Sequence, residues 1–302
     1  MRVLITGAHG QLGHDLMDAF SGQLPAGGDA ALGCDLRGGY QEHEVFGFGR
    51  GELDVTDASA VISVMNDLKP DCVVHAAAYT AVDAAETDGD RVDHVNVQGT
   101  QHVLEAAEVQ KARFITFSTD YVFDGGKADA YEEDDLVSPL NRYGLSKAKA
   151  ETIVGERGLV IRSSWLAGVH GQPTVLKAVK RVGEGKSVKF VSDQVGSFTA
   201  CADLAAATTA LAEMDATGLI HVANQGSVSW FELVRFAVQS AGLDPHFVAP
   251  TTTQALGLTA AAKRPKNSAL ATKRAKSLGL SLPEWQNGIA RLVSAAHIHP
   301  KP

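Results

Sequence analysis

Three side chains in the first half of the chain have the types and the spacing needed to reduce a ketone. Tyr143 and Lys147 are four residues apart, so they share one face of the helix predicted over 142–156. Thr119 comes just after Phe114–Phe117, an apolar run that predicts a buried strand. A ketone that accepts a hydride gains negative charge on its oxygen, and a positioned phenol can donate a proton to it. These residues therefore predict a ketone reductase with Tyr143 as proton donor.

The surroundings of these residues support this interpretation more than the spacing does. Ser118–Asp120 ends the predicted strand, and ligands of open α/β sheets bind beyond the carboxyl ends of the strands. A free phenol has a pKa near 10, which is too high for efficient proton transfer at neutral pH. We expect the Lys147 ammonium to lower the pKa of Tyr143, because it favours the phenolate. We expect the Thr119 hydroxyl to donate a hydrogen bond to the carbonyl oxygen.

A glycine-rich run at the N-terminus predicts a site for a dinucleotide cofactor. Gly7, Gly10 and Gly13 follow the predicted strand Val3–Ile5 and open a helix predicted over 10–20. Such glycines make a tight turn, let the backbone approach a pyrophosphate, and let the helix pack close to the sheet. The helix N-terminus supplies free N–H groups for the phosphates. The alternative is a turn without a ligand, and the order of strand, turn and helix favours the cofactor.

Two segments compete for the second strand, whose end selects between NADPH and NADH. The segment 31–35 ends in Asp35, while Glu44–Phe48 is followed closely by Arg50. We prefer the second segment, because Asp54 then follows at a short spacing and can reach the adenine. An arginine at this place suits the 2′-phosphate of NADPH. The alternative for Arg50 is a solvated loop cation, so NADH remains an open choice.

Short apolar runs that alternate with helical patterns predict a doubly wound α/β fold. Cys72–His75 and Leu159–Ile161 are two further buried strands, and 90–110 is a predicted helix between strands. This pattern indicates a Rossmann-like parallel sheet. Ala76–Ala78 follows one strand, and its small side chains let a flat ring and a ribose lie against the backbone. The alternative is tight packing alone.

The second half of the chain is less regular and predicts a smaller C-terminal substrate-binding domain. Helical patterns cover 173–185 and 230–241. We expect the cofactor-binding domain to comprise residues 1–163 and about 195–225. The substrate domain then comprises about 164–194 and 226–302. A stretch from 21 to 43 holds several glycines and predicts a long surface loop or insert.

Composition excludes several classes of protein. The 302 residues carry a net charge of −8, which argues against a nucleic-acid partner. No window approaches the roughly 20 apolar residues of a membrane span. Three cysteines without a C-x-x-C pair indicate a reduced, cytoplasmic setting. None of the eleven histidines lies in a zinc-binding pattern, so we expect no metal site.

Longer motifs run through the chain. The first set comprises Gly7-x-x-Gly10-x-x-Gly13, Asn96-Val97-x-Gly99-Thr100 and Tyr143-x-x-x-Lys147. The second set comprises Ala76–Asp83, Ser118–Phe123, Ser138-Pro139-Leu140-Asn141-x-Tyr143-Gly144-x-x-Lys147, Ser164-Trp165, Asp193-Gln194 and Arg264-Pro265-x-Asn267-Ser268. The first set resembles the extended short-chain dehydrogenase/reductase family. The second resembles, within it, the dTDP-4-dehydrorhamnose reductase family, over residues 1 to about 288.

This resemblance implies a reductase that converts dTDP-4-dehydro-6-deoxy-L-mannose to dTDP-L-rhamnose with NADPH. It implies that Tyr143 donates the proton, Lys147 orients the nicotinamide ribose and Thr119 polarises the C4 carbonyl. The sugar pocket would contain Thr80, Val82, Asp120, Tyr121 and Trp165, although Trp165 could instead be a core aromatic residue. Arg264 and Asn267 would approach the nucleotide, although Arg264 could instead form a salt bridge. We expect cofactor contacts from Gly7, His9, Gly10, Gln11, Leu12, Gly13, Arg50, Asp54, Val55, Ala76, Ala77, Ala78, Tyr143 and Lys147.

The chain departs from the family pattern in three places. The 21–43 insert is longer than the usual first connection, and Phe198 replaces an expected proline on the substrate side. Some family members carry a magnesium ion at a carboxylate-built dimer contact. Asp15 matches one carboxylate position, but Ala202 and Gln286 fall where others are needed, so we expect no magnesium and either a monomer or a homodimer. Two alternatives stay open: a reductase of another dTDP-4-keto-deoxysugar, and a non-catalytic NADP-binding regulatory subunit.

Overall fold

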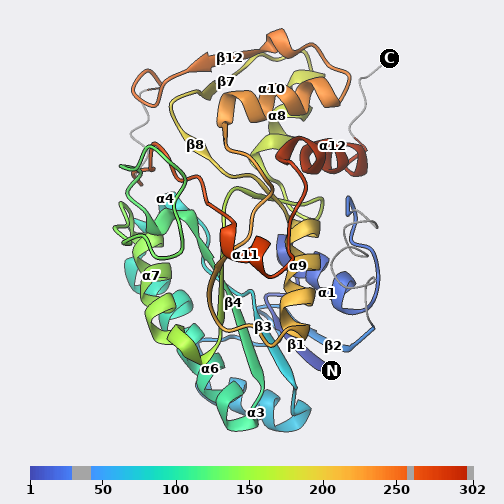
Figure 1. The fold of residues 1–302 in the computed structure, drawn as a ribbon, viewed down its shortest axis with the longest axis vertical. Coiled ribbons are helices and arrows are strands. Elements are labelled where there is room, and N and C mark those ends of the chain that lie inside the picture. Colours follow the sequence, from blue (N-terminus) through green and yellow to red (C-terminus); the bar gives the residue numbers. More distant parts are fainter. Residues whose placement is uncertain (29–41, 257–261, 298–302) are drawn as a thin grey trace.

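A six-stranded parallel sheet forms the centre of the molecule (Figure 1). The computed structural model describes residues 1–28, 42–256 and 262–297. The strand order is β10-β5-β4-β3-β1-β2, and every neighbouring pair is parallel. The strands are β1 Arg2–Thr6, β2 Glu44–Phe48, β3 Cys72–His75, β4 Arg113–Thr119, β5 Leu159–Ser163 and β10 Gly218–His221. This confirms the predicted doubly wound, Rossmann-like fold. From β1 the chain adds β2 on one side and then β3, β4, β5 and β10 on the other, so the order of the strands switches beside β1.

Helices cover both faces of the sheet, which explains why the strands are apolar without alternation. Val3 and Ile5 pack on one side against α1 and α9, while Leu4 between them packs on the other side against α3 and α6. The helices of the sheet are α1 Gln11–Phe20, α3 Ala58–Leu68, α4 Val82–Ala85, α5 Gly89–Asp93, α6 Gly99–Gln110, α7 Arg142–Val154 and α9 Cys201–Glu213, with π-helical η1 His94–Gln98 and 3-10 turns η2 Asp120–Val122 and η3 Gly155–Arg157.

The remaining elements gather beyond the carboxyl ends of the strands, at the top of Figure 1. They enclose a second apolar core, in which Phe198 and Ile289 are fully buried. The predicted division into two domains at the stated boundaries stays a prediction. These elements are β6 Leu166–Ala167, α8 Thr174–Gly183, β7 Val188–Val191, β8 Val195–Gly196, β9 Thr199–Ala200, β11 Val228–Ser229, α10 Trp230–Ser240, η4 Pro245–Phe247, β12 Val248–Thr251 and α12 Trp285–Ala295. The short helix α11 Lys273–Ser277 lies lower, beside β10, and its Ala275 packs into the first core.

In the first half, the structure changes one predicted element and confirms another. The helix predicted over 90–110 is α5, the π-helical turn η1 and α6 in succession. The competition for the second strand is decided in favour of Glu44–Phe48, which pairs with β1. The rival segment 31–35 lies outside the described residues, as does most of the 21–43 insert. Of that insert, Ser21 forms a bridge with Glu42.

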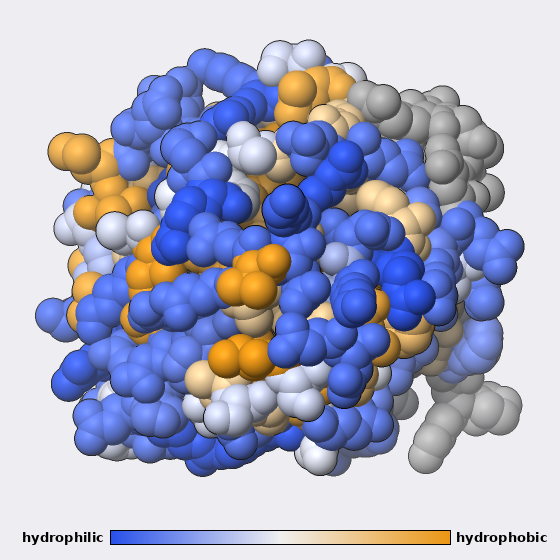
Figure 2. Space-filling model, turned by 90° about the horizontal axis from the view of Figure 1, so that it is seen from below, coloured by the Kyte–Doolittle hydropathy of each residue, from blue (hydrophilic) through white to orange (hydrophobic). Residues whose placement is uncertain are grey.

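The surface is that of a mostly hydrophilic molecule. Seen from the α3 and α6 end, hydrophilic side chains predominate and apolar ones form small separate groups (Figure 2). Within residues 1–28, 42–256 and 262–297, no helix is both long enough and apolar enough to span a membrane.

Candidate active site

The glycine-rich run forms a tight turn between β1 and α1. Gly7 has a φ of +72°, and a Cβ atom there would lie 2.6 Å from the backbone nitrogen of Ala77. A Cβ atom on Gly13 would lie 2.2 Å from the carbonyl oxygen of Gly7. Only glycine therefore allows this approach of helix to strand. Gly10 precedes α1 without a side-chain cap, so the first N–H groups of the helix have no side-chain acceptor there.

Two cavities meet over this turn. The first has a volume of about 330 Å³ and the second about 510 Å³. Residues that line both are Gly7, Gly10, Ala76 and Ala78. The predicted cofactor residues that line only the first are His9, Arg50, Asp54, Val55 and Ala77. Those that line only the second are Gln11, Leu12, Gly13, Tyr143 and Lys147. Because they share these lining residues, the two cavities adjoin and form one groove over the glycine turn.

Charged side chains surround the first cavity. Arg50 is exposed at its edge. The carboxylate of Glu52 accepts the N–H of Gly49 at 2.8 Å and lies 3.5 Å from the imidazole of His9. Asp54 accepts two hydrogen bonds from Thr56, which lower the pKa of its carboxyl. Both hydrogen bonds end on the same carboxylate oxygen, and the expected contact of Asp54 with the adenine stays a prediction.

Sequence reasoning missed Arg91, which also lines the first cavity. Its guanidinium lies 5.7 Å from the ring centre of Tyr79, another lining residue. Arg91 comes from α5, and no sequence pattern indicated that this short helix lies beside the strand ends. A cation so placed adds to the positive charge at the mouth of the groove.

The second cavity brings together the predicted catalytic residues. Tyr143 and Lys147 from α7 line it together with Thr119 from the end of β4. The predicted sugar-pocket residues that line it as well are Thr80, Val82, Asp120, Tyr121 and Trp165. These side chains come from segments that are far apart in the sequence. Their convergence is what the parallel sheet, with its carboxyl ends at one edge, provides.

Three buried serine hydroxyls in the wall of this cavity were not predicted as site residues. Ser118, Ser163 and Ser164 line it, and no hydrogen bond of good geometry joins their hydroxyl oxygens to a described residue. The Ser164 hydroxyl nevertheless lies close enough to Asp120 to lower the pKa of that carboxyl. A buried hydroxyl without a partner costs free energy, so such groups point to a polar ligand. Ser118 and Ser164 stand in motifs that the sequence analysis singled out. No sequence pattern pointed to Ser163, because only the packing of β5 beside β4 brings this residue to the cavity.

Close backbone packing positions α7 at the cavity. The side chain of Asn141 caps the helix by accepting the N–H of Gly144 at 2.7 Å. A Cβ atom on Gly144 would lie 2.1 Å from the carbonyl oxygen of Tyr121. The absence of a side chain on Gly144 lets the first turn of α7 touch the turn η2. Tyr143 is thereby held beside Thr119 and Asp120.

The π-helical turn η1 fixes α7 from the other side. Asn96 in this turn donates a hydrogen bond to the Ser146 hydroxyl at 2.9 Å. The same side chain accepts the Tyr79 N–H and donates to the Tyr79 carbonyl oxygen. Such π-bulges are frequent at functional sites. Asn96 therefore ties together the loop that carries Thr80 and the helix that carries Tyr143.

Burial, and not the lysine charge, dominates the pKa of Tyr143 in this structure. Burial and the charge of Asp120 raise that pKa, while the neighbouring Thr119 hydroxyl acts in the opposite direction. The expected lowering by Lys147 is not found. Burial lowers the pKa of Lys147 itself to about 8, with Glu151 acting against that shift. The four-residue spacing places both groups in one cavity but does not set the sign of the pKa shift, which depends on the surroundings.

Trp165, which lines the second cavity, has an unusual backbone conformation. Its φ is +44°, a value that non-glycine residues rarely adopt. Its ring stacks on Trp230 with 4.3 Å between centres and 20° between planes, and it packs against Gly196. Trp230, at the start of α10, lines the same cavity and was not predicted. Strained residues of this kind concentrate at ligand sites.

The C-terminal candidates lie beside the second cavity rather than in it. Arg264 pairs with both carboxylate oxygens of Asp83 at 2.8 Å, so the salt-bridge alternative describes its contacts here. Asn267 donates to the carbonyl oxygens of Lys127, Ala128 and Asp129, and its expected nucleotide contact stays a prediction. Phe198 is fully buried in the second apolar core and is not among the residues that line the cavity.

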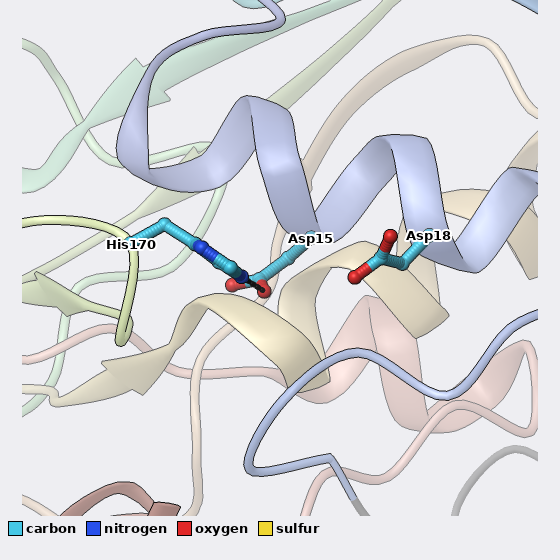
Figure 3. A group of neighbouring side chains, drawn as sticks. All are labelled: Asp15, Asp18 and His170. Carbon is cyan, nitrogen blue, oxygen red and sulfur yellow. Dashed lines mark ion pairs between the residues drawn. The ribbon is translucent and has the colours of Figure 1, made fainter. Parts of the chain in front are cut away.

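One group of side chains could hold a cation. Ligand atoms of Asp15, Asp18 and His170 all lie within 4.8 Å of one another (Figure 3). Asp15 is fully buried, and neither of its carboxylate oxygens has a hydrogen-bond partner. Burial raises the pKa of this carboxyl to about 7. The sequence analysis considered Asp15 alone, because His170 comes from a distant loop. Carboxylates with an imidazole suit a divalent cation, and the mechanism proposed below uses none.

Comparison with known proteins agrees with this geometry. A family model described as the RmlD substrate binding domain matches residues 1–298. The chain belongs to this family. A dTDP-4-dehydrorhamnose reductase of Streptomyces griseus is 35% identical over 94% of this chain and 90% of its own length. A dTDP-4-keto-6-deoxy-D-glucose reductase of Streptomyces niveus is 33% identical over 82% of each chain.

A solved structure of a family member shares the whole fold. The dTDP-4-dehydrorhamnose reductase of Bacillus anthracis, in complex with NADP, superposes with a TM-score of 0.85. It is 33% identical, and the match covers 96% of this chain and 98% of that one. The family resemblance inferred from the motifs is thereby confirmed.

Proposed function

We propose that this protein is an NADPH-dependent reductase that converts the C4 ketone of dTDP-4-dehydro-6-deoxy-L-mannose (dTDP-4-dehydrorhamnose) to the alcohol of dTDP-L-rhamnose. The observation that carries the proposal is the second cavity. There Thr119, Tyr143 and Lys147 stand at one end of a groove that continues over the glycine turn. Relatives named as dTDP-4-dehydrorhamnose reductases match nearly the full chain.

The groove fits NADPH. The backbone of Gly7 and Gly10 and the first N–H groups of α1 would hold the pyrophosphate. Arg50 would bind the 2′-phosphate. The nearby carboxylate of Glu52 is unfavourable for this contact, because it repels a phosphate. NADH is the alternative cofactor. Lys147 would hydrogen-bond the nicotinamide ribose. The unpartnered hydroxyls of Ser118 and Ser163 supply polar contacts in the second cavity. The bound cofactor supplies the hydride.

The residues of the chain supply the proton and the electrostatic support. Burial keeps Tyr143 protonated at neutral pH, so its hydroxyl is ready to donate to the oxygen of the ketone as charge develops there. The Thr119 hydroxyl lies close to the Tyr143 phenol and donates a second hydrogen bond to the same oxygen. A positioned general acid is typically worth about 10²–10⁴ in rate.

The nucleotide part of the substrate has a candidate cavity of its own. A cavity of about 480 Å³ is lined by Lys263, Arg264 and Lys266 together with Gln194 and Thr253. Three basic side chains suit a diphosphate. Arg264 links this cavity to the sugar pocket, because it pairs with Asp83 on the other side of the cleft. We therefore still expect Arg264 to contact the nucleotide. In the protein without substrate, its guanidinium pairs with Asp83.

A second candidate function is the reduction of another dTDP-4-keto-deoxysugar. It is favoured by the relative from Streptomyces niveus, whose identity to this chain is 33%. The third candidate is a non-catalytic NADP-binding subunit. It has less support, because Thr119, Tyr143 and Lys147 line one cavity.

A coupled assay tests all three. dTDP-glucose is passed through a 4,6-dehydratase and a 3,5-epimerase, and this protein is added with NADPH or NADH. Stoichiometric loss of NADPH absorbance with dTDP-L-rhamnose as the product, identified by NMR, supports the main proposal. A different stereochemistry, or consumption only when the epimerase is omitted, supports the second. NADPH that binds but is never consumed supports the third.

A further inference from the structure

Asp120 is a buried carboxyl that connects the end of β4 to the C-terminal part of the chain. Its exposed fraction is 2%, and it lines the second cavity. One carboxylate oxygen accepts the hydroxyl of Ser268 at 2.5 Å, and the other accepts the hydroxyl of Thr119 at 3.1 Å. Ser268 belongs to the same segment as Arg264. The segment that borders the nucleotide cavity therefore fixes the carboxyl that faces Thr119.

This contact uses the only proton of the Thr119 hydroxyl. The oxygen of that hydroxyl accepts the N–H of Tyr121 at 3.2 Å, while its proton is donated to Asp120. A charged carboxylate accepts hydrogen bonds and cannot donate one. As long as Asp120 is charged, the Thr119 proton is directed to the carboxylate and away from a ketone in the cavity.

We propose that Asp120 is a positioning residue for the reduction, whose protonation decides whether the Thr119 hydroxyl donates to Asp120 or to the substrate. This inference rests on the proposed function. When Asp120 carries a proton, its O–H donates to the Thr119 oxygen, and the Thr119 proton turns to the ketone. No proton is transferred between the two residues, and the proton that completes the alcohol comes from Tyr143. A neutral Asp120 also removes a negative charge near the oxygen that becomes negative.

The surroundings move the titration of this carboxyl towards neutral pH. Burial raises the pKa of Asp120 to about 6, although hydrogen bonds from Ser268, Ser164 and Thr119 lower it, so the neutral form predominates only below about pH 6. The titratable groups that face it are the phenols of Tyr143, from α7, and of Tyr121, from its own turn. Both phenols have raised pKa values and stay uncharged in this range. Arg264, on the segment of Ser268, pairs with Asp83 instead.

Asp120→Asn tests the proposal, because the amide resembles the protonated acid. Its N–H₂ can donate to Thr119 while its oxygen accepts from Ser268. The measurement is the rate of NADPH oxidation in single turnovers with the dTDP-4-keto sugar, between pH 5.5 and 7.5. For the wild-type protein we expect a fall that approaches tenfold per pH unit above the apparent pKa of Asp120. For Asp120→Asn we expect a rate that is constant within about threefold over this pH range. In separate steady-state measurements, its KM for the keto sugar should change by less than threefold.

Two further variants separate positioning from a general structural role. The Ser268 hydrogen bond favours the charged carboxylate, so Ser268→Ala should move the fall in rate to higher pH by about one half to one unit. In a Thr119→Ala background, adding Asp120→Asn should leave the rate unchanged, because the effect acts through Thr119. Asp244→Asn, a surface carboxylate that pairs with His246 in η4, should keep the wild-type profile.

The outcomes distinguish this inference from the proposed function. If the wild-type protein reduces the keto sugar but its rate does not vary between pH 5.5 and 7.5, this inference alone is overturned. The same follows if Asp120→Asn keeps the wild-type slope or is inactive at every pH, or if Ser268→Ala shifts the profile to lower pH or not at all. A wild-type protein that reduces no dTDP-4-keto sugar overturns the proposed function and this inference together.

Discussion

Gly144 and Tyr121 touch backbone to backbone, since a Cβ atom on Gly144 would meet the Tyr121 carbonyl oxygen at 2.1 Å. This contact sets how close α7 comes to the turn after β4. Tyr143, the proposed proton donor, is the residue before Gly144. The distance between Tyr143 and Thr119 therefore depends on a position that has no side chain.

Gly144→Ala should displace the start of α7 and lower turnover by about 10- to 100-fold, because misplacement by about 1 Å can cost a factor near 10². The measurement is kcat with the keto sugar, together with the melting temperature. Gly183→Ala is the matched control, because Gly183 lies in α8 and a Cβ atom there meets nothing closer than 3.7 Å. That variant should keep normal turnover and gain stability of about 1 kcal/mol or less. Normal turnover in Gly144→Ala would show that the contact does not position Tyr143.

Tyr143→Phe should leave the affinity for NADPH almost unchanged and lower turnover by two or more orders of magnitude, because it removes the general acid. Steady-state kinetics and cofactor binding by fluorescence measure the two effects separately. Tyr131→Phe is the control: its hydroxyl donates to Asp124 at 2.8 Å and the residue does not line the second cavity. The control should lose some stability but little turnover. A Tyr143→Phe protein of near-normal rate would refute the proposed mechanism.

Arg50→Ala should raise the KM for NADPH by about 10- to 100-fold, the magnitude of one or two charge-assisted hydrogen bonds. The KM for NADH should change little, because NADH has no 2′-phosphate. Arg157→Ala removes an exposed arginine that pairs with Glu108 and should affect neither cofactor. An unchanged KM for both cofactors would indicate that Arg50 is a solvated loop cation, and an equal rise for both would contradict the assigned contact with the 2′-phosphate.

Asp15→Asn should stabilise the protein at pH 8 and have little effect near pH 4. Burial raises the pKa of Asp15 to about 7 from an ordinary value of 3.8. The folded state therefore binds this proton more tightly than the unfolded chain does. The contribution of Asp15 to stability is greatest below pH 3.8 and falls as the pH rises through 7. Removing the carboxylate should recover on the order of a few kcal/mol at pH 8.

Thermal unfolding at pH 4 and pH 8, in the presence of a chelator, measures this difference. The chelator matters because a divalent cation bound by Asp15, Asp18 and His170 (Figure 3) would stabilise the charged carboxylate and reverse the effect. Asp67→Asn, at an exposed position on α3, should show no such pH dependence. Equal stability of Asp15→Asn and the wild-type protein at pH 8 would contradict the raised pKa.

Local sequence was enough to predict the elements that carry the site. The glycine turn, the strand Cys72–His75 and the helix of Tyr143 each depend on residues within one short segment. The π-helical turn around Asn96 was not predicted, because its amide bonds the distant residues Tyr79 and Ser146. Short-range patterns cannot report such contacts.

By itself, the sequence determined the strands that lead into the site, the glycine turn after β1 and the three side chains proposed to react, since backbone preferences and apolar periodicity act between near neighbours. Only the tertiary structure decided the charge environment of Tyr143, the pairing of Arg264 with Asp83 and the convergence of Ser163 and Trp230 on one cavity. Burial and hydrogen bonding depend on which segments pack together, and this is settled only when the whole chain has folded around the sheet.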